Sequence, residues 1–285
     1  MATVPYIMPS ELLAESAGAI DFTTLYPTSP LSMEQKLAKL CREVSDTIDD
    51  ICGKYVYSAR KKYTLRASED TESAISTERM QAMLNSRGEL LFIANYRPII
   101  TVTSFLWAPV TVPVISMEPV DLELVSVEGR DIIATGMWEV FRYSDLRITV
   151  TYVNGFPNTL LSSNVAGGAD TLVVDDITGF RVGDDVEIMD DLGEGLTVSA
   201  IDTTTRTLTF NETLVGPHAA GVRITEIPRS VHRAAIYLAW DVAQSHARQG
   251  LAIAKLGLMG GEEIERPINF KKEAMDRLQP YILTP

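Results

Sequence analysis

The chain has 285 residues, of which 46% are hydrophobic and 22% charged, and this composition is typical of folded globular proteins rather than disordered ones. The length suits about two domains. The formal net charge of −13 argues against a protein that grips nucleic-acid phosphates, because such proteins present a basic surface.

The sequence features that bear on export and those that bear on cysteine oxidation predict the same compartment. The amino terminus, MATVPYIMPSELLAES, lacks the basic start and continuous apolar run of a secretion signal. No stretch reaches the roughly 18 uncharged apolar residues that a membrane span needs. Cys41 and Cys52 fall on one predicted helix, about 16 Å apart along its axis, so they cannot form a disulfide. We expect a soluble protein with reduced, buried cysteines, made in the cytoplasm.

The amino-terminal thirty residues read as an extended arm with one short helix over Ser10–Ala17. Apolar side chains in this arm need a surface to pack on. We favour the chain's own core, and a neighbouring subunit is the alternative. From Ser32 an amphipathic helix of about 20 residues is predicted, because Ser32 and Gln35 have capping-box spacing and apolar residues then recur every three or four positions.

Beyond this helix the chain turns polar and then strand-like. Three adjacent cations, Arg60-Lys61-Lys62, favour a solvated turn, with contact to an acidic partner or to passing DNA as the sharper alternative. The segment Glu69–Asn85 predicts a loop or a marginal helix. Apolar runs divided by Pro and Gly then indicate an antiparallel meander. These runs are Leu90–Ala94, Ile99–Trp107, Val110–Ile115, Val120–Val127, Ile132–Ala134 and Met137–Arg142.

The stretch Arg147–Pro157, RITVTYVNGFP, decides the domain organisation. Alternating β-branched and aromatic residues predict a half-buried strand, which Asn154-Gly155 ends. The composition then changes until a helix opens at Pro228, a natural first-turn residue. We therefore expect one domain formed by residues 1–162 and 227–285, interrupted by a second domain formed by residues 163–226.

The predicted insert, residues 163–226, contains short strand-like runs punctuated by Gly and Asp, which is typical of a small β-barrel or sandwich. Twelve acids and three arginines give it a net charge of −9, leaving −13 − (−9) = −4 for the rest. Calcium prefers oxygen ligands of this kind, but the spacing matches no EF-hand loop, so we favour a solvated acidic surface. The acidic clusters are Asp175-Asp176, Asp184-Asp185 and Asp190-Asp191 with Glu194.

The carboxy-terminal part is helical. Val231–Gln249 forms a second long helix with apolar residues on more than one face, so we expect it to be covered from several sides, one of them by another subunit. A glycine-containing joint over Leu256–Glu265 leads to a short helix, Phe270–Leu278, and an apolar tail from Pro280.

Motifs of enzyme chemistry are missing from the sequence. There is no GxxxxGK[ST] loop, GxGxxG turn, HExxH helix or GxSxG elbow. His232 and His246 lie about 21 Å apart along one helix, too far to share a metal ion, and His218 lies in a turn where a structural role is expected. We therefore expect no catalytic residues, no metal site and no cofactor.

Four short segments, taken in order, resemble the head–tail connector (adaptor) family of long-tailed bacteriophages. One difference is Phe156, where the family usually has tyrosine. Residues 163–226 depart from the compact form of the family, and are similar to a small β-module that decorates various phage structural proteins. The four segments are Ile48-Asp49-Asp50-Ile51-Cys52-Gly53, Arg97-Pro98-Ile99-Ile100-Thr101-Val102, Val150-Thr151-Tyr152-Val153-Asn154-Gly155-Phe156, and the helix led by Pro228 with Leu278-Gln279-Pro280-Tyr281.

This resemblance implies an α+β fold: a helical connector core with antiparallel β-strands, plus the inserted all-β barrel or sandwich domain. It implies a structural virion protein of the capsid–tail neck, a homo-oligomeric ring of twelve copies that docks on the portal protein. The ring would link the capsid to a downstream neck, stopper or tail protein, while DNA passes through without specific binding.

By analogy with the family, the portal contact lies in the carboxy-terminal segment, and Arg60, Lys61 and Lys62 are a second candidate contact with a partner or with DNA in the channel. Two other functions remain open: a tail-completion or baseplate ring protein, and a module that binds calcium or a glycan through the acidic insert. The portal-binding candidates are Phe270, Lys271, Lys272, Tyr281 and Ile282.

Overall fold

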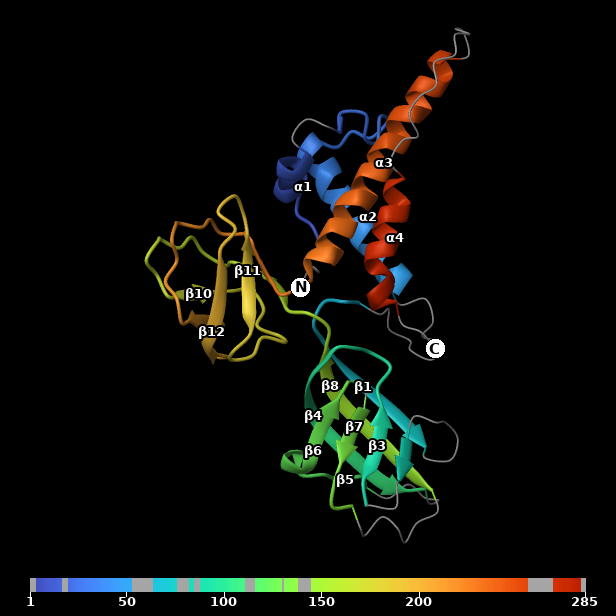
Figure 1. The fold of residues 1–285 in the computed structure, drawn as a ribbon, viewed down its shortest axis with the longest axis vertical. Helices are drawn as coiled ribbons and strands as arrows, with labels where there is room; N and C mark the ends of the chain where they lie inside the picture. The colour runs from blue at the N-terminus through green and yellow to red at the C-terminus, as the bar shows by residue number, and fades with distance from the viewer. Residues whose placement is uncertain are drawn as a thin grey trace.

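The computed structural model describes residues 4–16, 20–52, 64–75, 82–84, 88–110, 116–129, 131–137, 145–255 and 269–282. It has three parts: a group of helices, a six-stranded sheet beside them, and two four-stranded sheets at the other end of the molecule (Figure 1). The mixture of helices and antiparallel sheets confirms the predicted α+β class. In the part of the chain that the structure describes, every helix is too short or too polar to cross a bilayer.

Within the described residues, the helical part contains four α-helices and a short 3-10 helix. The predicted capping box closes at the start of α2: the Ser32 N–H donates to Gln35 Oε1 at 3.1 Å, and the Gln35 N–H donates to Ser32 Oγ at 3.3 Å. The apolar stripe of α2 then faces the core. The helices are α1 (Pro9–Ser16), α2 (Met33–Cys52), α3 (Arg229–Lys255), α4 (Phe270–Leu278) and η3 (Gln279–Tyr281).

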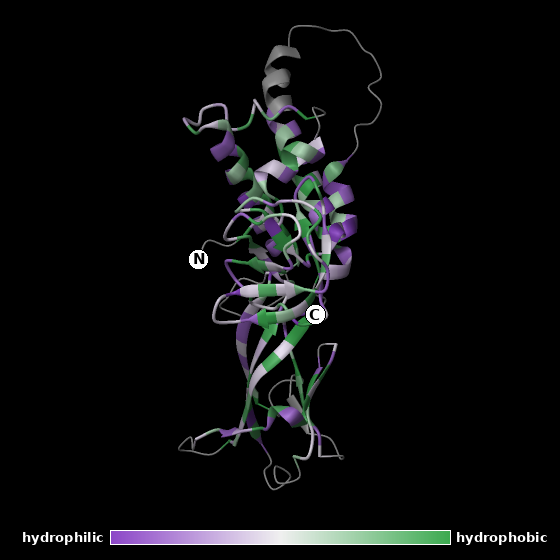
Figure 2. Cartoon of the chain, turned by 90° about the vertical axis from the view of Figure 1, so that its left-hand side faces the viewer, coloured by the Kyte–Doolittle hydropathy of each residue, from purple (hydrophilic) through white to green (hydrophobic). Residues whose placement is uncertain are grey.

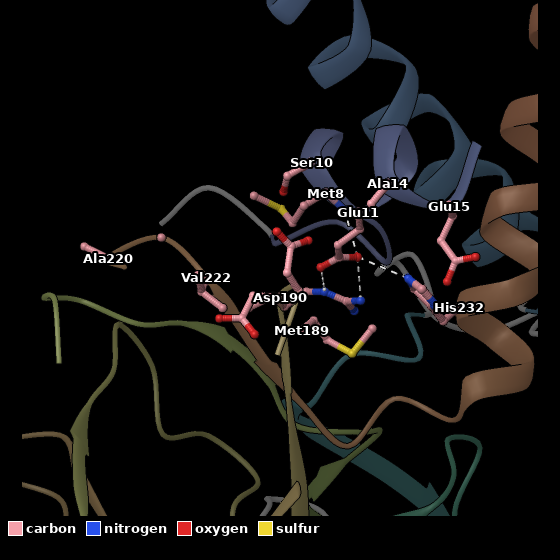
Figure 3. Close-up of a pocket in the computed structure, with 13 residues that line it drawn as sticks. Met8, Ser10, Glu11, Ala14, Glu15, Met189, Asp190, Ala220, Val222 and His232 are labelled. Carbon is pink, nitrogen blue, oxygen red and sulfur yellow. Dashed lines mark hydrogen bonds and ion pairs between the residues drawn. The ribbon is translucent and has the colours of Figure 1, made fainter. Parts of the chain in front are cut away.

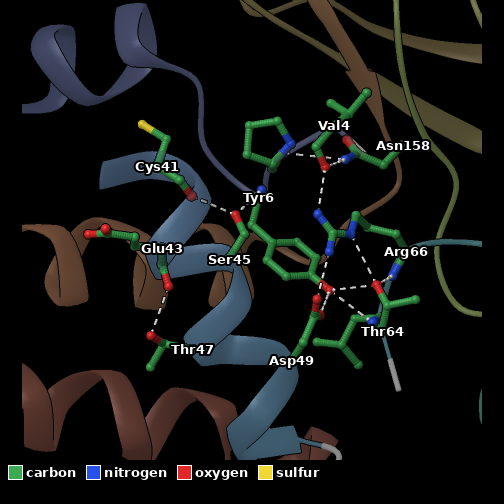
Figure 4. A network of polar contacts seen from close by, with 12 residues as sticks. Val4, Tyr6, Cys41, Glu43, Ser45, Thr47, Asp49, Thr64, Arg66 and Asn158 are labelled. Atoms are coloured by element: carbon green, nitrogen blue, oxygen red, sulfur yellow. Dashed lines mark hydrogen bonds and ion pairs between the residues drawn. The ribbon is translucent and has the colours of Figure 1, made fainter. Parts of the chain in front are cut away.

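The amino-terminal arm packs on the chain's own core, as the favoured interpretation predicted, and Tyr6 is fully buried. The Tyr6 hydroxyl donates to the Asp49 carboxylate and accepts from the Leu65 N–H at 2.8 Å (Figure 4). Arg66 completes the network, because it donates to Asp49 Oδ2 at 2.6 Å and to the Val4 carbonyl at 3.0 Å. Burial and the charge of Asp49 raise the pKa of Tyr6 well above its ordinary value.

Two four-stranded antiparallel sheets form the part farthest from the helices, and hydrophobic residues alternate along their strands (Figure 2). The central strand β8 buries Leu146, Ile148, Val150 and Tyr152 on one face, which confirms the alternation predicted for this strand. The first sheet has the order β1 (Ser68–Ile75), β8 (Leu146–Asn154), β4 (Ile99–Pro109), β5 (Glu118–Pro119), and the second β2 (Ala82–Leu84), β3 (Leu90–Ile93), β7 (Asp131–Ala134), β6 (Val125–Glu128).

The prediction of a loop or marginal helix over Glu69–Asn85 is wrong for its described residues, because Ser68–Ile75 form strand β1 against β8 and Ala82–Leu84 form β2. The polar side chains of β1 find partners across the ladder. Thr71 and Thr151 pair through their hydroxyls at 2.9 Å, and Glu72 accepts hydrogen bonds from the Tyr152 hydroxyl and the Asn95 amide. Burial raises the pKa of Glu72. The polar strand β1 is stable here because side chains across the ladder form hydrogen bonds with its polar side chains.

A second correction concerns Val120–Val127, predicted as one strand. Residues Leu122–Leu124 form a 3-10 helix, and β6 begins only at Val125. The cause is local: the Asp121 carboxylate accepts from the Glu123 N–H at 3.1 Å and caps the helix. The predicted run Val110–Ile115 lies almost wholly outside the described residues, as does Met137–Arg142.

Residues 158–225 form one six-stranded antiparallel sheet with its own cluster of buried apolar residues. Two hydrogen bonds join its outermost strands, β9 and β10: the Ser162 N–H donates to the Val173 carbonyl at 2.8 Å and the Asp175 N–H to the Leu160 carbonyl at 2.9 Å. The order is β10 (Thr171–Val173), β13 (Thr207–Phe210), β12 (Gly195–Asp202), β11 (Asp185–Met189), β14 (Arg223–Thr225), β9 (Asn158–Leu160).

The segments before and after this six-stranded sheet share one core. A single cluster of buried residues includes Tyr152 before it and Ile227 and Val231 after it. The crossings into and out of the sheet are adjacent, because the Glu226 N–H donates to the Pro157 carbonyl at 3.0 Å.

Helix α3 is covered largely within the chain. Val231 and Ala239 are fully buried, the Trp240 Nε1–H donates to Ser16 Oγ at 2.8 Å, and Phe270 stacks on Tyr237. Residues 231–243 therefore do not require the second subunit that was expected to cover one apolar face of this helix. The reason is that α1, α2 and α4 already surround this length of the helix (Figure 1).

Candidate functional site

The carboxy-terminal segment lies against the turns that follow β3 and β8. The rings of Tyr281 and Phe156 meet edge to face, with centroids 6.2 Å apart and an interplanar angle of 80°. The Tyr281 hydroxyl lies 2.9 Å from Ser230 Oγ at the start of α3, and Arg97 Nη2 donates to the Ile282 carbonyl at 3.3 Å. We call this meeting point of residues 97–98, 155–156, 230 and 280–282 the C-terminal junction.

Gly155 lies at a close backbone crossing in the junction, where any side chain would clash. Its φ is +94°, and its N–H donates to the Pro98 carbonyl at 2.9 Å. A Cβ atom here would lie 2.6 Å from the Arg66 carbonyl oxygen, which is closer than van der Waals contact allows. The neighbouring Phe156 N–H donates to the Leu65 carbonyl. The strand break predicted at Asn154-Gly155 is therefore a close backbone crossing.

A pocket of about 330 Å³ opens at the C-terminal junction. Its walls are mostly apolar, and Arg97 is the one charged residue among the described residues that line it. This volume is at the low end for ligand sites, so it suits one apolar side chain of a partner rather than a folded element. The lining residues are Leu65, Arg97, Pro98, Gly129, Phe156, Pro280 and Tyr281.

The structure separates the predicted portal-binding residues into two groups. Phe270 is only 9% exposed, because its ring packs 6.0 Å from Tyr237 and 5.4 Å from Trp240, so it anchors α4 inside the chain. Lys271 and Lys272 are exposed on the first turn of α4. Tyr281 and Ile282 are half-buried at the junction, and the second predicted contact, Arg60, Lys61 and Lys62, lies outside the described residues.

Sequence reasoning did not place Arg97, Phe156 and Ser230 in the site. Each lies in or beside one of the four family-like segments, which was the available signal. Their contacts with residues 281–282 join positions up to 185 residues apart, and no local pattern announces such pairs.

A buried ion cluster joins α1 to the six-stranded sheet and to α3 (Figure 3). Arg223 Nε and Nη2 donate to Glu11 Oε1 and Oε2 at 2.9 and 2.8 Å, and His232 Nε2 lies 3.2 Å from Glu11 Oε2. Burial raises the pKa of Glu11, but the hydrogen bond with His232 and the attraction of Arg223 outweigh it, so the net shift is downward. Sequence reasoning missed this cluster.

The acidic clusters of the six-stranded sheet mainly close turns. Asp176 accepts from the Thr178 N–H at 2.9 Å, and Asp190 accepts from the Leu192 N–H at 3.0 Å. Glu194 accepts from the Val215 and Gly216 N–H groups, both at 2.8 Å. His218, expected to be structural, lies buried with Nδ1 2.5 Å from Asp190 Oδ2 and Nε2 3.3 Å from Glu194 Oε1.

The described residues also bear on metal binding and on thiol reactivity. Over the described ranges, no three His, Cys, Asp or Glu side chains are grouped so as to hold a metal ion. Cys41 and Cys52 are free and fully buried, as predicted, and burial raises the pKa of each thiol to about 12. A thiol with so high a pKa is a poor nucleophile.

No known protein-family model matches the chain, and no curated protein sequence matches it significantly.

Proposed function

We propose that the protein is a structural subunit of the head–tail connector of a long-tailed bacteriophage, a ring protein that docks on the portal and passes DNA to the next neck or tail component. The observation that carries this proposal is the C-terminal junction. Segments from three of the four family-like motifs meet there, and the remaining one, through Asp49, binds Arg66 beside it. Motifs scattered along the sequence by chance have no reason to meet in space.

In this proposal, the helices and the two four-stranded sheets form the connector core, and the six-stranded sheet is the inserted barrel. Two observations support this division. The core residues before and after the insert belong to one buried cluster, and the insert has a separate one. The hydrogen bonds between β9 and β10 join the edges of the insert's sheet, as closure of a barrel requires.

Charge supports a channel rather than a nucleic-acid clamp. The whole chain carries −13, and like charge repels the phosphates of DNA that must slide past without sticking. The ring and its location in the virion neck follow from the resemblance, and each subunit of such a ring contacts two neighbours through different surfaces that close.

The portal contact is proposed to use the outer face of the C-terminal segment. Lys271 and Lys272 supply exposed charge, and Tyr281 and Ile282 lie beside the apolar pocket, which can receive a partner side chain. Phe270 has a structural role in this proposal. It packs α4 against α3 and so holds Lys271 and Lys272 in position.

Multi-angle light scattering and negative-stain microscopy of the full chain with purified portal protein test the proposal. We expect rings bound to the portal, and Lys272→Glu should weaken the complex more than Lys36→Glu, the same charge reversal on α2. A chain that stays monomeric and ignores the portal contradicts the proposal. Cross-linking in intact virions to a tail protein instead of the portal would place the subunit in a tail-completion or baseplate ring.

A further inference from the structure

A second pocket, of about 360 Å³, lies between α1 and the inserted sheet (Figure 3). We call it the α1 cleft. One wall is α1 with Met8 before it, and the other is formed by residues 189–191 at the end of β11 and residues 220–223 at the start of β14. The volume is at the low end of ligand sites and holds one or two residues of a peptide.

Arg223 lines this cleft and carries an unused donor. Its guanidinium is fully buried, and Nε and Nη2 are both bound to the Glu11 carboxylate. The third nitrogen, Nη1, is buried without a hydrogen-bond partner anywhere in the described chain. A buried donor without an acceptor is costly, so an oxygen acceptor delivered to Nη1 would be stabilised.

Asp191, on the same wall as Arg223, is an unused acceptor. Its side chain is exposed, and it makes no hydrogen bond or ion pair with any residue in the described ranges. The other acids that line the cleft are engaged: Glu11 with Arg223, Glu15 with Arg233 at 2.8 Å, and Asp190 with His218. The insert as a whole has twelve acids and three arginines, so the field at this wall favours cations.

We propose that the α1 cleft binds one lysine or arginine residue of a partner protein. The cationic end of the side chain would pair with Asp191, and the aliphatic stem would lie against Met8 and Met189, which suit irregular apolar contacts. The main-chain carbonyl of the same residue would accept from Arg223 Nη1. An anionic ligand is disfavoured, because it would approach Glu15, Asp190 and Asp191 together.

The test uses the full chain with methyl-labelled methionine and follows the Met8 and Met189 signals by NMR, assigned with Met8→Leu and Met189→Leu. The probe is capped lysine, N-acetyl-lysine methylamide. We expect saturable shifts of both signals in the millimolar range. Capped norleucine, which has the same stem and no charge, should bind at least about threefold more weakly. Butylammonium, which lacks the carbonyl, should also bind more weakly than capped lysine.

Two variants with the same change of charge make the result specific. Asp191→Asn should weaken capped lysine binding about threefold, whereas Glu128→Gln, on strand β6, should leave it unchanged. The proposal is overturned if the Met8 and Met189 signals do not shift at capped lysine concentrations up to 100-fold above the expected millimolar range. Equal binding of capped norleucine also overturns it. Equal losses in the two variants also overturn it, since they would indicate general attraction to an acidic surface. Equal binding of butylammonium overturns the role given to Arg223.

Discussion

Glu11 of α1 and Arg223 of β14 form a two-point ion pair across 212 residues of sequence, with N–O distances of 2.9 and 2.8 Å. The pair attaches the six-stranded sheet to α1, in addition to the chain crossings at Pro157 and Glu226 and to the ion pair between Arg229 of α3 and Glu187 of β11. The amino-terminal helix therefore contacts the six-stranded sheet through Arg223 and α3 through His232.

Replacing Glu11 with Gln should lower the free energy of unfolding by about 3 kcal/mol, because it leaves the buried Arg223 without its counter-charge. Urea titration followed by intrinsic fluorescence measures the loss. The control is Glu15→Gln, one turn along the same helix, whose pair with Arg233 is partly exposed and should cost less than about 1 kcal/mol. Equal, small losses would show that the Glu11 pair contributes no more than a surface pair.

Gly155 and Gly193 both have positive φ and should respond differently to alanine. Gly155→Ala should lower stability by roughly 3 kcal/mol or more, because the new Cβ meets the Arg66 carbonyl at 2.6 Å in addition to the backbone strain. Gly193→Ala has open space around it and should cost only about 1 kcal/mol. Thermal unfolding of the two variants compares them directly, and a Gly155→Ala protein as stable as Gly193→Ala contradicts the close crossing.

Glu226 should make stability fall as the pH rises. Burial and the charge of Asp184 raise its pKa to about 8 from an ordinary value of 4.5. The folded chain therefore holds the proton more tightly than the unfolded chain does, so the stabilising contribution is complete below pH 4.5 and is lost as the pH rises through 8.

Calorimetric melting temperatures between pH 5 and pH 9 check this sign. Glu226→Gln should flatten the decline toward alkaline pH and should be more stable than the unmodified chain at pH 9. Glu187→Gln, on β11 with an exposed Arg229 pair, is the matched control and should follow the unmodified chain. A decline that Glu226→Gln leaves unchanged would assign the effect to other groups.

Tyr281 and Ser230 should behave as a coupled pair. Tyr281→Phe removes the hydroxyl and keeps the ring on Phe156, so it should cost about 1 kcal/mol of local stability in the C-terminal segment. Ser230→Ala should cost a similar amount, and the double variant should add little to either. Hydrogen exchange over residues 269–282 reports the loss. Fully additive effects would mean that the two hydroxyls do not interact.

Periodic and local signals were enough to predict several elements. The capping box and apolar stripe of α2, the alternation of β8 and the bounds of α4 all follow from residues within a few positions of one another. Local strand-like runs within residues 163–226 likewise predicted β10 to β14, whereas β9 begins before that predicted boundary. Local hydrogen bonds and side-chain spacing determine such features, so one sequence suffices to read them.

Tertiary structure alone decided the features that depend on distant partners. Strand β1 looks like a loop in sequence, because its hydroxyls and its Glu72 carboxylate are satisfied only by β8 and Asn95. The Glu11–Arg223 pair, the cover over α3 and the contact of Tyr281 with Phe156 likewise join residues that share no local pattern. Burial makes these contacts strong, and burial is a property of the whole folded chain, which no single stretch of sequence contains.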